Sequence, residues 1–147
     1  MNDAFGCAHR AHSSIVGLTN QTKVAGLLLE KEITYLQEFL IKPKRPVVFI
    51  LGGAKIKDKI QLIINLLDLV DEIIIGGGMS NPFLHRMYGL KLGSSRLNMP
   101  DDPTLIDKII EKAKARGVKI HLPIDGVCAQ ALSDSAPTAI YENHLVP

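Results

Sequence analysis

The sequence predicts an α/β fold in which a parallel sheet carries helices on both faces, the arrangement called Rossmann-like. Two short runs, "VVFIL" at 47–51 and the isoleucines of "EIII" at 73–75, are apolar throughout, end in glycines and lead into helical patterns. Strands covered on both faces are apolar throughout, and strands that alternate with helices form βαβ units. Without hairpin signals between them, these strands are expected to run parallel.

The first half of the chain begins with a loop and a long helix. Residues 1–18 are a polar loop leading into a short helix, and the apolar positions of residues 24–40 recur at spacings of three and four. That spacing is typical of an amphipathic helix. The two prolines of "IKPKRP" cannot continue it, so the helix ends there.

Three further helices and one further strand complete the predicted secondary structure. Helical spacing returns over residues 55–70 and again over 81–90. The pair Asp102-Pro103 begins another helix, with the acid at its cap and the proline in its first turn, and Gly117 ends it. Residues 118–124 alternate between apolar and polar side chains, which predicts a strand.

Composition narrows the class of protein. The 147 residues are 46% hydrophobic and 22% charged, enough for one compact core. A net charge of +2 and 5% aromatic residues argue against a nucleic-acid partner. Cys7 and Cys128 lack metal-ligand spacing and are interpreted as reduced thiols of a cytosolic protein. No run has the length of a membrane span and no signal peptide is visible, so a cytoplasmic location is expected.

Both apolar strands end in glycines, at Gly52–Gly53 and at Gly76–Gly78. Ligands of open parallel sheets bind beyond the carboxyl ends of the strands, and glycine lets the backbone approach them closely. Neither junction matches a Walker A loop or Gly-x-Gly-x-x-Gly. The alternative is that these glycines only turn tight corners between strand and helix.

Lys55 and Lys59 lie four positions apart at the start of the predicted helix, so they are expected to share a face. Like charges at this spacing repel, and cations are unfavourable at a helix N-terminus. An anion between them would explain the pair. The alternative is a solvated lysine face partly neutralised by Asp58.

The N-terminal loop places His9, Arg10 and His12 within four positions. An arginine grips phosphate or carboxylate with two hydrogen bonds, which predicts an anion as the partner. A metal site is weakly supported, because no carboxylate or cysteine completes a ligand set. Alternatively, the histidines bond loop backbone and Arg10 pairs with an acid.

Four segments together resemble the phosphoglycerate kinase family: "NDAFGCAHRAHSS", "LGGAKIKDKIQLI", "IIIGGGM" and "GVKIHLPID". The similarity covers nearly the whole chain. It implies reversible phosphoryl transfer between 1,3-bisphosphoglycerate and ADP, giving 3-phosphoglycerate and ATP in glycolysis. The family members are cytosolic and usually monomeric, with two α/β domains, and they use ATP or ADP with magnesium.

The resemblance also implies roles for residues. His9, Arg10 and His12 belong to the basic patch that binds phosphoglycerate, and Arg10 touches the substrate directly. Lys55 stabilises the transferring phosphoryl group, so Arg10 and Lys55 are the predicted catalytic residues, while Lys59 moves onto a nucleotide phosphate. The implied nucleotide site consists of Gly53, Ala54, Lys55, Lys59, Gly77 and Gly78, the last two packing against adenine.

Relative to the family, this chain is expected to be incomplete. Residues 1–23 correspond to the end of the substrate domain, 24–42 to the interdomain helix and 43–147 to the first part of the nucleotide domain. The family's other substrate-binding arginines and its magnesium-binding Gly-Gly-Gly-Asp-Thr segment have no counterpart, so no metal ligand is predicted here. Pro82 and Arg96 also depart from the family pattern near the adenine.

Three hypotheses follow. The first is a fragment of a phosphoglycerate kinase that is inactive alone. The second is a noncatalytic module that binds adenine nucleotide, and the third is an unrelated anion-binding α/β domain. Because the family's remaining strands would cover the sheet edges, the isolated chain is expected to be poorly soluble or molten.

Overall fold

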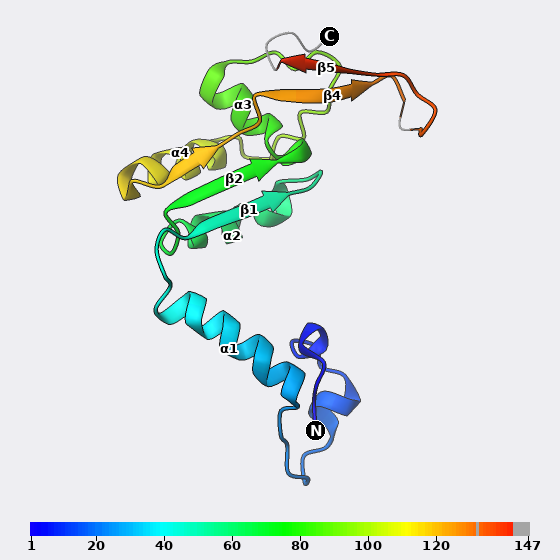
Figure 1. The fold of residues 1–147 in the computed structure, drawn as a ribbon, viewed down its shortest axis with the longest axis vertical. Coiled ribbons are helices and arrows are strands. Elements are labelled where there is room, and N and C mark those ends of the chain that lie inside the picture. Colours follow the sequence, from blue (N-terminus) through cyan, green and yellow to red (C-terminus); the bar gives the residue numbers. More distant parts are fainter. Residues whose placement is uncertain (132, 143–147) are drawn as a thin grey trace. The chain divides into compact units, whose positions relative to one another are not determined.

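The chain folds into two compact units, Met1–Lys44 (unit 1) and Arg45–Pro147 (unit 2), as Figure 1 shows. The structure is a computed structural model that describes residues 1–131 and 133–142. The assignment of residues 1–23, 24–42 and 43–147 to a substrate domain, an interdomain helix and a nucleotide domain stays a prediction. No helix in the described part of the chain combines the length and apolar character that crossing a bilayer requires.

Unit 1 consists of loop segments and one long helix. A short 3-10 helix at Phe5–Cys7 and a π-helical turn at Ser13–Gly17 precede α1, Leu27–Ile41. Residues 24–40 were predicted to form this helix, and the observed helix begins three positions later. Long-range contacts of the N-terminal segment explain the difference.

The start of α1 is held by residues from the beginning of the chain. Asn2 donates its backbone N–H to the carbonyl of Val24 at 2.9 Å and accepts the N–H of Gly26 at 2.7 Å. The Oδ1 atom of Asp3 accepts the N–H of Leu29 at 2.8 Å, one of the first helical donors that need a partner. A Cβ at Gly26 would collide with the Asp3 side chain, so this position requires glycine.

Unit 2 contains the predicted parallel sheet, which confirms the α/β class. The strands β1 (Val48–Gly52), β2 (Glu72–Gly76) and β3 (Lys119–His121) lie in the order β1-β2-β3 and are all parallel. Their register pairs the last residue of β1, Gly52, with the last residue of β2, Gly76. The two glycine-containing junctions therefore leave the sheet side by side.

The helices of unit 2 are α2 (Ile60–Leu66), α3 (Asn81–Tyr88) and α4 (Thr104–Arg116). The helix predicted over 55–70 is shorter because its first turn, Lys57–Lys59, is a 3-10 helix. At α4, Pro103 occupies the N-cap position. The preceding Asp102 satisfies the helix start, since its Oδ1 accepts the N–H of Thr104 at 3.0 Å.

An antiparallel hairpin, which no signal in the sequence predicted, follows the parallel sheet. Its strands are β4 (Asp125–Ala129) and β5 (Thr138–Glu142). The connection between them is long, and the two-residue Asn-Gly or Asp-Gly turn that signals a hairpin in a sequence is absent from it. The strand predicted over 118–124 is limited to β3, and Pro123 just beyond it has no N–H for a ladder.

The core of unit 2 lies on one face of the sheet. Ile73 and Ile75 of β2 are fully buried there, and the helices add the fully buried Ile63, Phe83 and Ile109. On the opposite face, the side chains of Ile50 and Ile74 are 72% and 37% exposed. Within unit 2 the described helices therefore bury one face of the sheet and leave the other accessible, whereas helices on both faces were predicted.

Charged side chains join the elements where the parallel strands begin. The Oδ2 atom of Asp71 accepts the backbone N–H of Val47 at 2.6 Å, and its Oδ1 pairs with Arg45 at 2.7 Å. The hydrogen bond from Val47 and the Arg45 guanidinium hold the pKa of the Asp71 carboxyl below its ordinary value. Asp71 therefore links the segment before β1 to the segment before β2.

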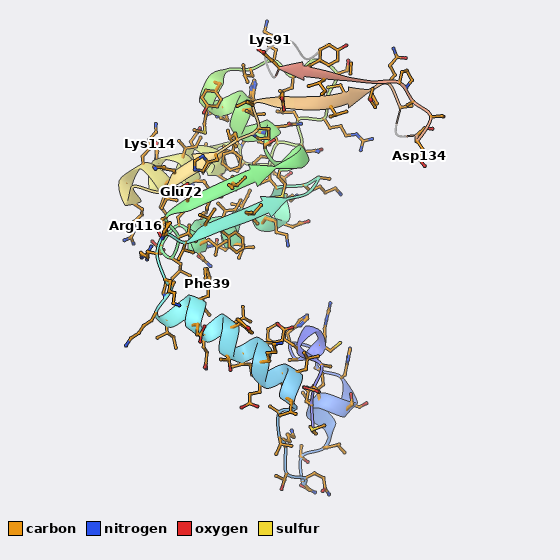
Figure 2. All side chains as sticks on the ribbon, in the orientation of Figure 1. Phe39, Glu72, Lys91, Lys114, Arg116 and Asp134 are labelled. Atoms are coloured by element: carbon orange, nitrogen blue, oxygen red, sulfur yellow. The ribbon has the colours of Figure 1, made fainter. Side chains whose placement is uncertain are left out.

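Two further acids at this end of unit 2 bind basic side chains. Glu72 accepts from His121 at 2.7 Å, and this hydrogen bond lowers the pKa of the Glu72 carboxyl. Asp68 pairs with Lys112 and Arg116 of α4, at 2.6 and 2.7 Å. Figure 2 labels Glu72 and Arg116, which both lie at this end of the unit.

We expect Asp71→Asn to destabilise unit 2 at neutral pH and to weaken the dependence of its stability on acid. Because the folded pKa of Asp71 lies below the unfolded one, its contribution is complete above the unfolded pKa and is lost as the pH falls through the folded pKa. Urea denaturation between about pH 3 and pH 7 measures the free energy of unfolding. Asp134→Asn, at an exposed position, is the matched control. An acid dependence equal to that of the unsubstituted chain would contradict this role.

Candidate functional site

The two glycine-containing junctions contact each other at the carboxyl ends of β1 and β2. The carbonyl of Gly53 accepts the backbone N–H of Met79 at 2.9 Å. The hydroxyl of Ser80, only 2% exposed, donates to the carbonyl of Gly77 at 2.7 Å. The loop after β1 and the loop before α3 therefore form one connected surface.

Glycine is required in these loops for both conformation and space. Gly53 has φ +146° and Gly77 has φ +62°, values that other residues rarely adopt. A Cβ on Gly77 would lie 3.1 Å from the Gly53 carbonyl oxygen, and one on Gly78 would lie 3.2 Å from that of Ala54. The tight-corner interpretation is thus correct in part, since the glycines let the loops pack together. Their contact with adenine stays a prediction.

A third segment, residues 93–99, crosses beside these loops and is called the strap below. Leu92 and Pro100, at its two ends, are buried. Between them, the carbonyl of Arg96 accepts a hydrogen bond from the Asn81 side chain of α3 at 2.8 Å. The side chain of Arg96 departs from the family pattern, but this hydrogen bond involves only its backbone carbonyl.

The strap also contacts the first junction directly. The Nδ2 atom of Asn98 donates to the carbonyl of Ala54 at 2.9 Å. Just after the strap, Asp101 forms an ion pair with Lys57, whose pKa is raised mainly by this hydrogen bond. Sequence reasoning missed Asn98. Its location among Pro and Asp residues, which are typical of turns, was the available signal.

Lys55 and Lys59 do not share a helical face as predicted. Lys55 precedes the 3-10 helix and Lys59 ends it, because Ile56 is fully buried and its carbonyl accepts the N–H of Lys59 at 2.8 Å. Both lysines are exposed, and among the described residues neither forms an ion pair. The alternative of solvated lysines is compatible with this exposure, although no ion pair of Asp58 occurs in the described residues and Lys57 pairs with Asp101 instead.

The predicted phosphoglycerate-binding residues, His9, Arg10 and His12, are exposed in unit 1. Within the described ranges their side chains form no hydrogen bond or ion pair, so the alternative of bonded histidines and a paired arginine finds no support. Nowhere in the described ranges, 1–131 and 133–142, do three His, Cys, Asp or Glu side chains form a group that could hold a metal ion. This cluster and the predicted nucleotide residues belong to different units.

An open pocket of about 750 Å³ lies elsewhere in unit 2. The strap contributes Ser94 and Ser95 to its wall, and the β4–β5 hairpin contributes most of the rest, including Cys128 and Tyr141. None of the predicted site residues lines it. The candidate nucleotide surface therefore consists of the glycine junctions and their lysines, which lie outside this hollow.

Comparison with known proteins identifies a single family. The family model described as phosphoglycerate kinase matches residues 1–146. Phosphoglycerate kinase of Tetrahymena pyriformis is 50% identical over 142 residues, which cover 97% of this chain and 38% of that relative. The enzyme of Paramecium primaurelia gives the same identity and the same coverage of both chains.

Solved structures of phosphoglycerate kinases also resemble this chain. The structure of phosphoglycerate kinase from Coxiella burnetii superposes with a TM-score of 0.80 at 36% identity, covering 99% of this chain and 38% of that one. The crystal structure of the enzyme from Pyrococcus horikoshii OT3 gives a TM-score of 0.71 at 25% identity, with the same coverage. The chain thus spans 38% of the length of these proteins.

We expect Gly77→Ala to destabilise unit 2 by roughly 1–3 kcal/mol, because alanine is strained at a positive φ and its Cβ would press on the Gly53 carbonyl. Gly52→Ala is the matched control, since a Cβ at Gly52 meets nothing within 4 Å. Urea denaturation followed by circular dichroism compares the two variants. Equal midpoints for both would show that the loop contact does not require glycine.

Proposed function

The chain belongs to the phosphoglycerate kinase family, and on this premise we propose that its residues serve reversible phosphoryl transfer between 1,3-bisphosphoglycerate and ADP, in glycolysis and in the cytoplasm. One observation carries the proposal: two glycine junctions in contact at the carboxyl ends of parallel strands, beside two exposed lysines that form no ion pair with the described residues. Ligands of open α/β sheets bind at this edge.

In unit 2, we assign the nucleotide to the surface formed by Gly53, Ala54, Gly77 and Gly78. The absence of side chains on the glycines allows a flat base to approach the backbone. Lys55 and Lys59 supply positive charge for the phosphates. Since phosphoryl transfer depends on positioning and on stabilising the charge of the transferring group, Lys55 is the proposed stabiliser and Lys59 the proposed ligand of a nucleotide phosphate.

In unit 1, we assign the phosphoglycerate to His9, Arg10 and His12. Arginine presents two parallel N–H groups to a carboxylate or a phosphate. The exposure of all three side chains and their lack of partners among the described residues support an external anion.

Magnesium enters this chemistry with the nucleotide. Mg²⁺ prefers carboxylate and other oxygen ligands, and the proposed nucleotide residues are glycine, alanine and lysine, which carry no carboxylate. We therefore assign no metal ligand within these residues. Bound magnesium would neutralise phosphate charge, while Lys55 acts on the transferring group.

The isolated 147 residues are proposed to bind ADP without catalysing transfer. They span 38% of their relatives, and their two groups of proposed ligand residues belong to separate compact units. Holding both reactants in line is worth about 7–11 kcal/mol of the barrier. A noncatalytic nucleotide-binding role is the second candidate, favoured because the nucleotide residues of unit 2 are already in contact with one another.

We expect ADP with magnesium to bind the chain at millimolar concentration, because only part of a nucleotide site is present. An NMR titration should shift the amide signals of Gly77 and Gly78 in a saturable way. Saturation at micromolar ADP, or shifts confined to unit 1, would refute this nucleotide site.

Catalysis should appear only in a longer polypeptide whose flanks are taken from a full-length relative. There, Lys55→Ala should lower kcat by roughly 10²-fold or more, since it removes stabilisation that grows in the transition state. Arg10→Ala should act largely on the KM for phosphoglycerate. Steady-state kinetics in both substrates separate these effects.

Lys114→Ala, at an exposed lysine of α4, is the control for loss of charge. An unchanged kcat in Lys55→Ala would contradict the role of Lys55. Turnover by the 147 residues alone at rates typical of enzymes would contradict the need for the flanks.

A further inference from the structure

We propose that Asn98 is a positioning residue of the nucleotide site, acting through the carbonyl of Ala54. This inference rests on the proposed nucleotide function of unit 2 and adds to it a residue that the sequence did not indicate. The ligand is an adenine nucleotide, and Asn98 is proposed to affect the binding of its phosphate groups.

The hydrogen bond is specific and long-range. It joins Asn98 Nδ2 to the Ala54 oxygen at 2.9 Å, across 44 positions of the sequence. Asn98 has φ +46°, and it is the one residue other than glycine with a positive φ in the described chain. Asparagine tolerates this left-handed conformation better than most residues. The backbone thus adopts an uncommon conformation where the side chain reaches the junction.

The strap that carries Asn98 is itself anchored. Leu92 is 9% exposed and Pro100 is buried, so both ends of the strap are fixed by packing. The Asn81 side chain holds the Arg96 carbonyl at 2.8 Å, two residues before Asn98. The donor therefore comes from a segment attached to the core and to α3.

Fixing the Ala54 carbonyl fixes the whole peptide group that joins Ala54 to Lys55. A trans peptide is planar, with its N–H directed opposite to its carbonyl, so the hydrogen bond sets the direction of the Lys55 N–H. Rotation of this peptide is further limited on the other side, because the Ala54 oxygen lies close to Gly78. Asn98 and Gly78 together determine how the backbone leading into Lys55 is presented.

The consequence concerns the phosphate end of the nucleotide. Lys55 is the proposed stabiliser of the transferring phosphoryl group, and a misplacement of its backbone weakens phosphate contacts more than the stacking of adenine on Gly77. Loss of the Asn98 hydrogen bond should therefore lower affinity for ADP while leaving adenosine binding nearly unchanged.

The test compares two substitutions by NMR titration with ADP plus magnesium and with adenosine. Asn98→Asp keeps size and tolerance of positive φ but cannot donate when ionised, and Asn98→Gly keeps the backbone conformation without any side chain. Asn65→Asp, at an exposed position of α2, adds the same charge away from the site.

Both Asn98 variants should bind ADP about 3- to 10-fold more weakly, the range for one hydrogen bond, and their Lys55 amide signal should move before ligand is added. The adenosine affinity of both variants, and the ADP and adenosine affinities of Asn65→Asp, should stay within twofold of those of the unsubstituted chain.

Unchanged ADP affinity in both Asn98 variants overturns the proposal while the nucleotide function stands. Equal weakening for adenosine and ADP also overturns it, because that pattern indicates a general loss of structure. If the unsubstituted chain shows no saturable shifts, the nucleotide function fails, and the role of Asn98 fails with it.

Discussion

The hydrogen bond from the Met79 N–H to the Gly53 carbonyl is the contact on which the candidate site depends. It can form only because two parallel strands end in register and because Gly77 and Gly78 bring no side chains between the loops. Each loop alone is an ordinary turn between a strand and a helix. Their contact creates a single backbone surface beside Lys55, so the chemistry of the site follows from close packing of main chain rather than from a cluster of side chains.

The two ends of the parallel sheet differ in their charge balance. Where the strands begin, Asp71 and Glu72 form ion pairs with Arg45 and Lys119 and stabilise the joins between elements. Where the strands end, Lys57 is paired with Asp101 while Lys55 and Lys59 have no acidic partner in the described residues. A cation left without its counter-ion raises the local potential, which favours an incoming anion. Paired charges thus stabilise one edge of the sheet, and at the other edge the charge balance favours an anion.

The sequence predicted the strands, their parallel arrangement and the glycine junctions at their carboxyl ends, because apolar runs such as 47–51 and terminal glycines are local signals. What failed depended on partners far away in the sequence. The start of α1 is set by Asp3, and the 3-10 turn before Lys59 is set by the burial of Ile56. The Asn98 contact spans 44 positions, so the local pattern could indicate a turn there but not the partner of the side chain. The β4–β5 hairpin was missed because its connecting loop lacks a short turn motif.

The N-terminal loop is closed at its base by hydrogen bonds, and this closure affects how far the length of the loop can change. Asn2 and Asp3 hold residues 24–29, so the intervening loop with its basic cluster is a ring closed by backbone and cap hydrogen bonds. The entropy of closing such a ring grows only with the logarithm of its length, about 0.6 kcal/mol for each doubling. Insertions or deletions of a few residues within the ring therefore leave the helix start intact. The position of Arg10 relative to α1 can therefore change over evolution at a small cost to the stability of the helix start.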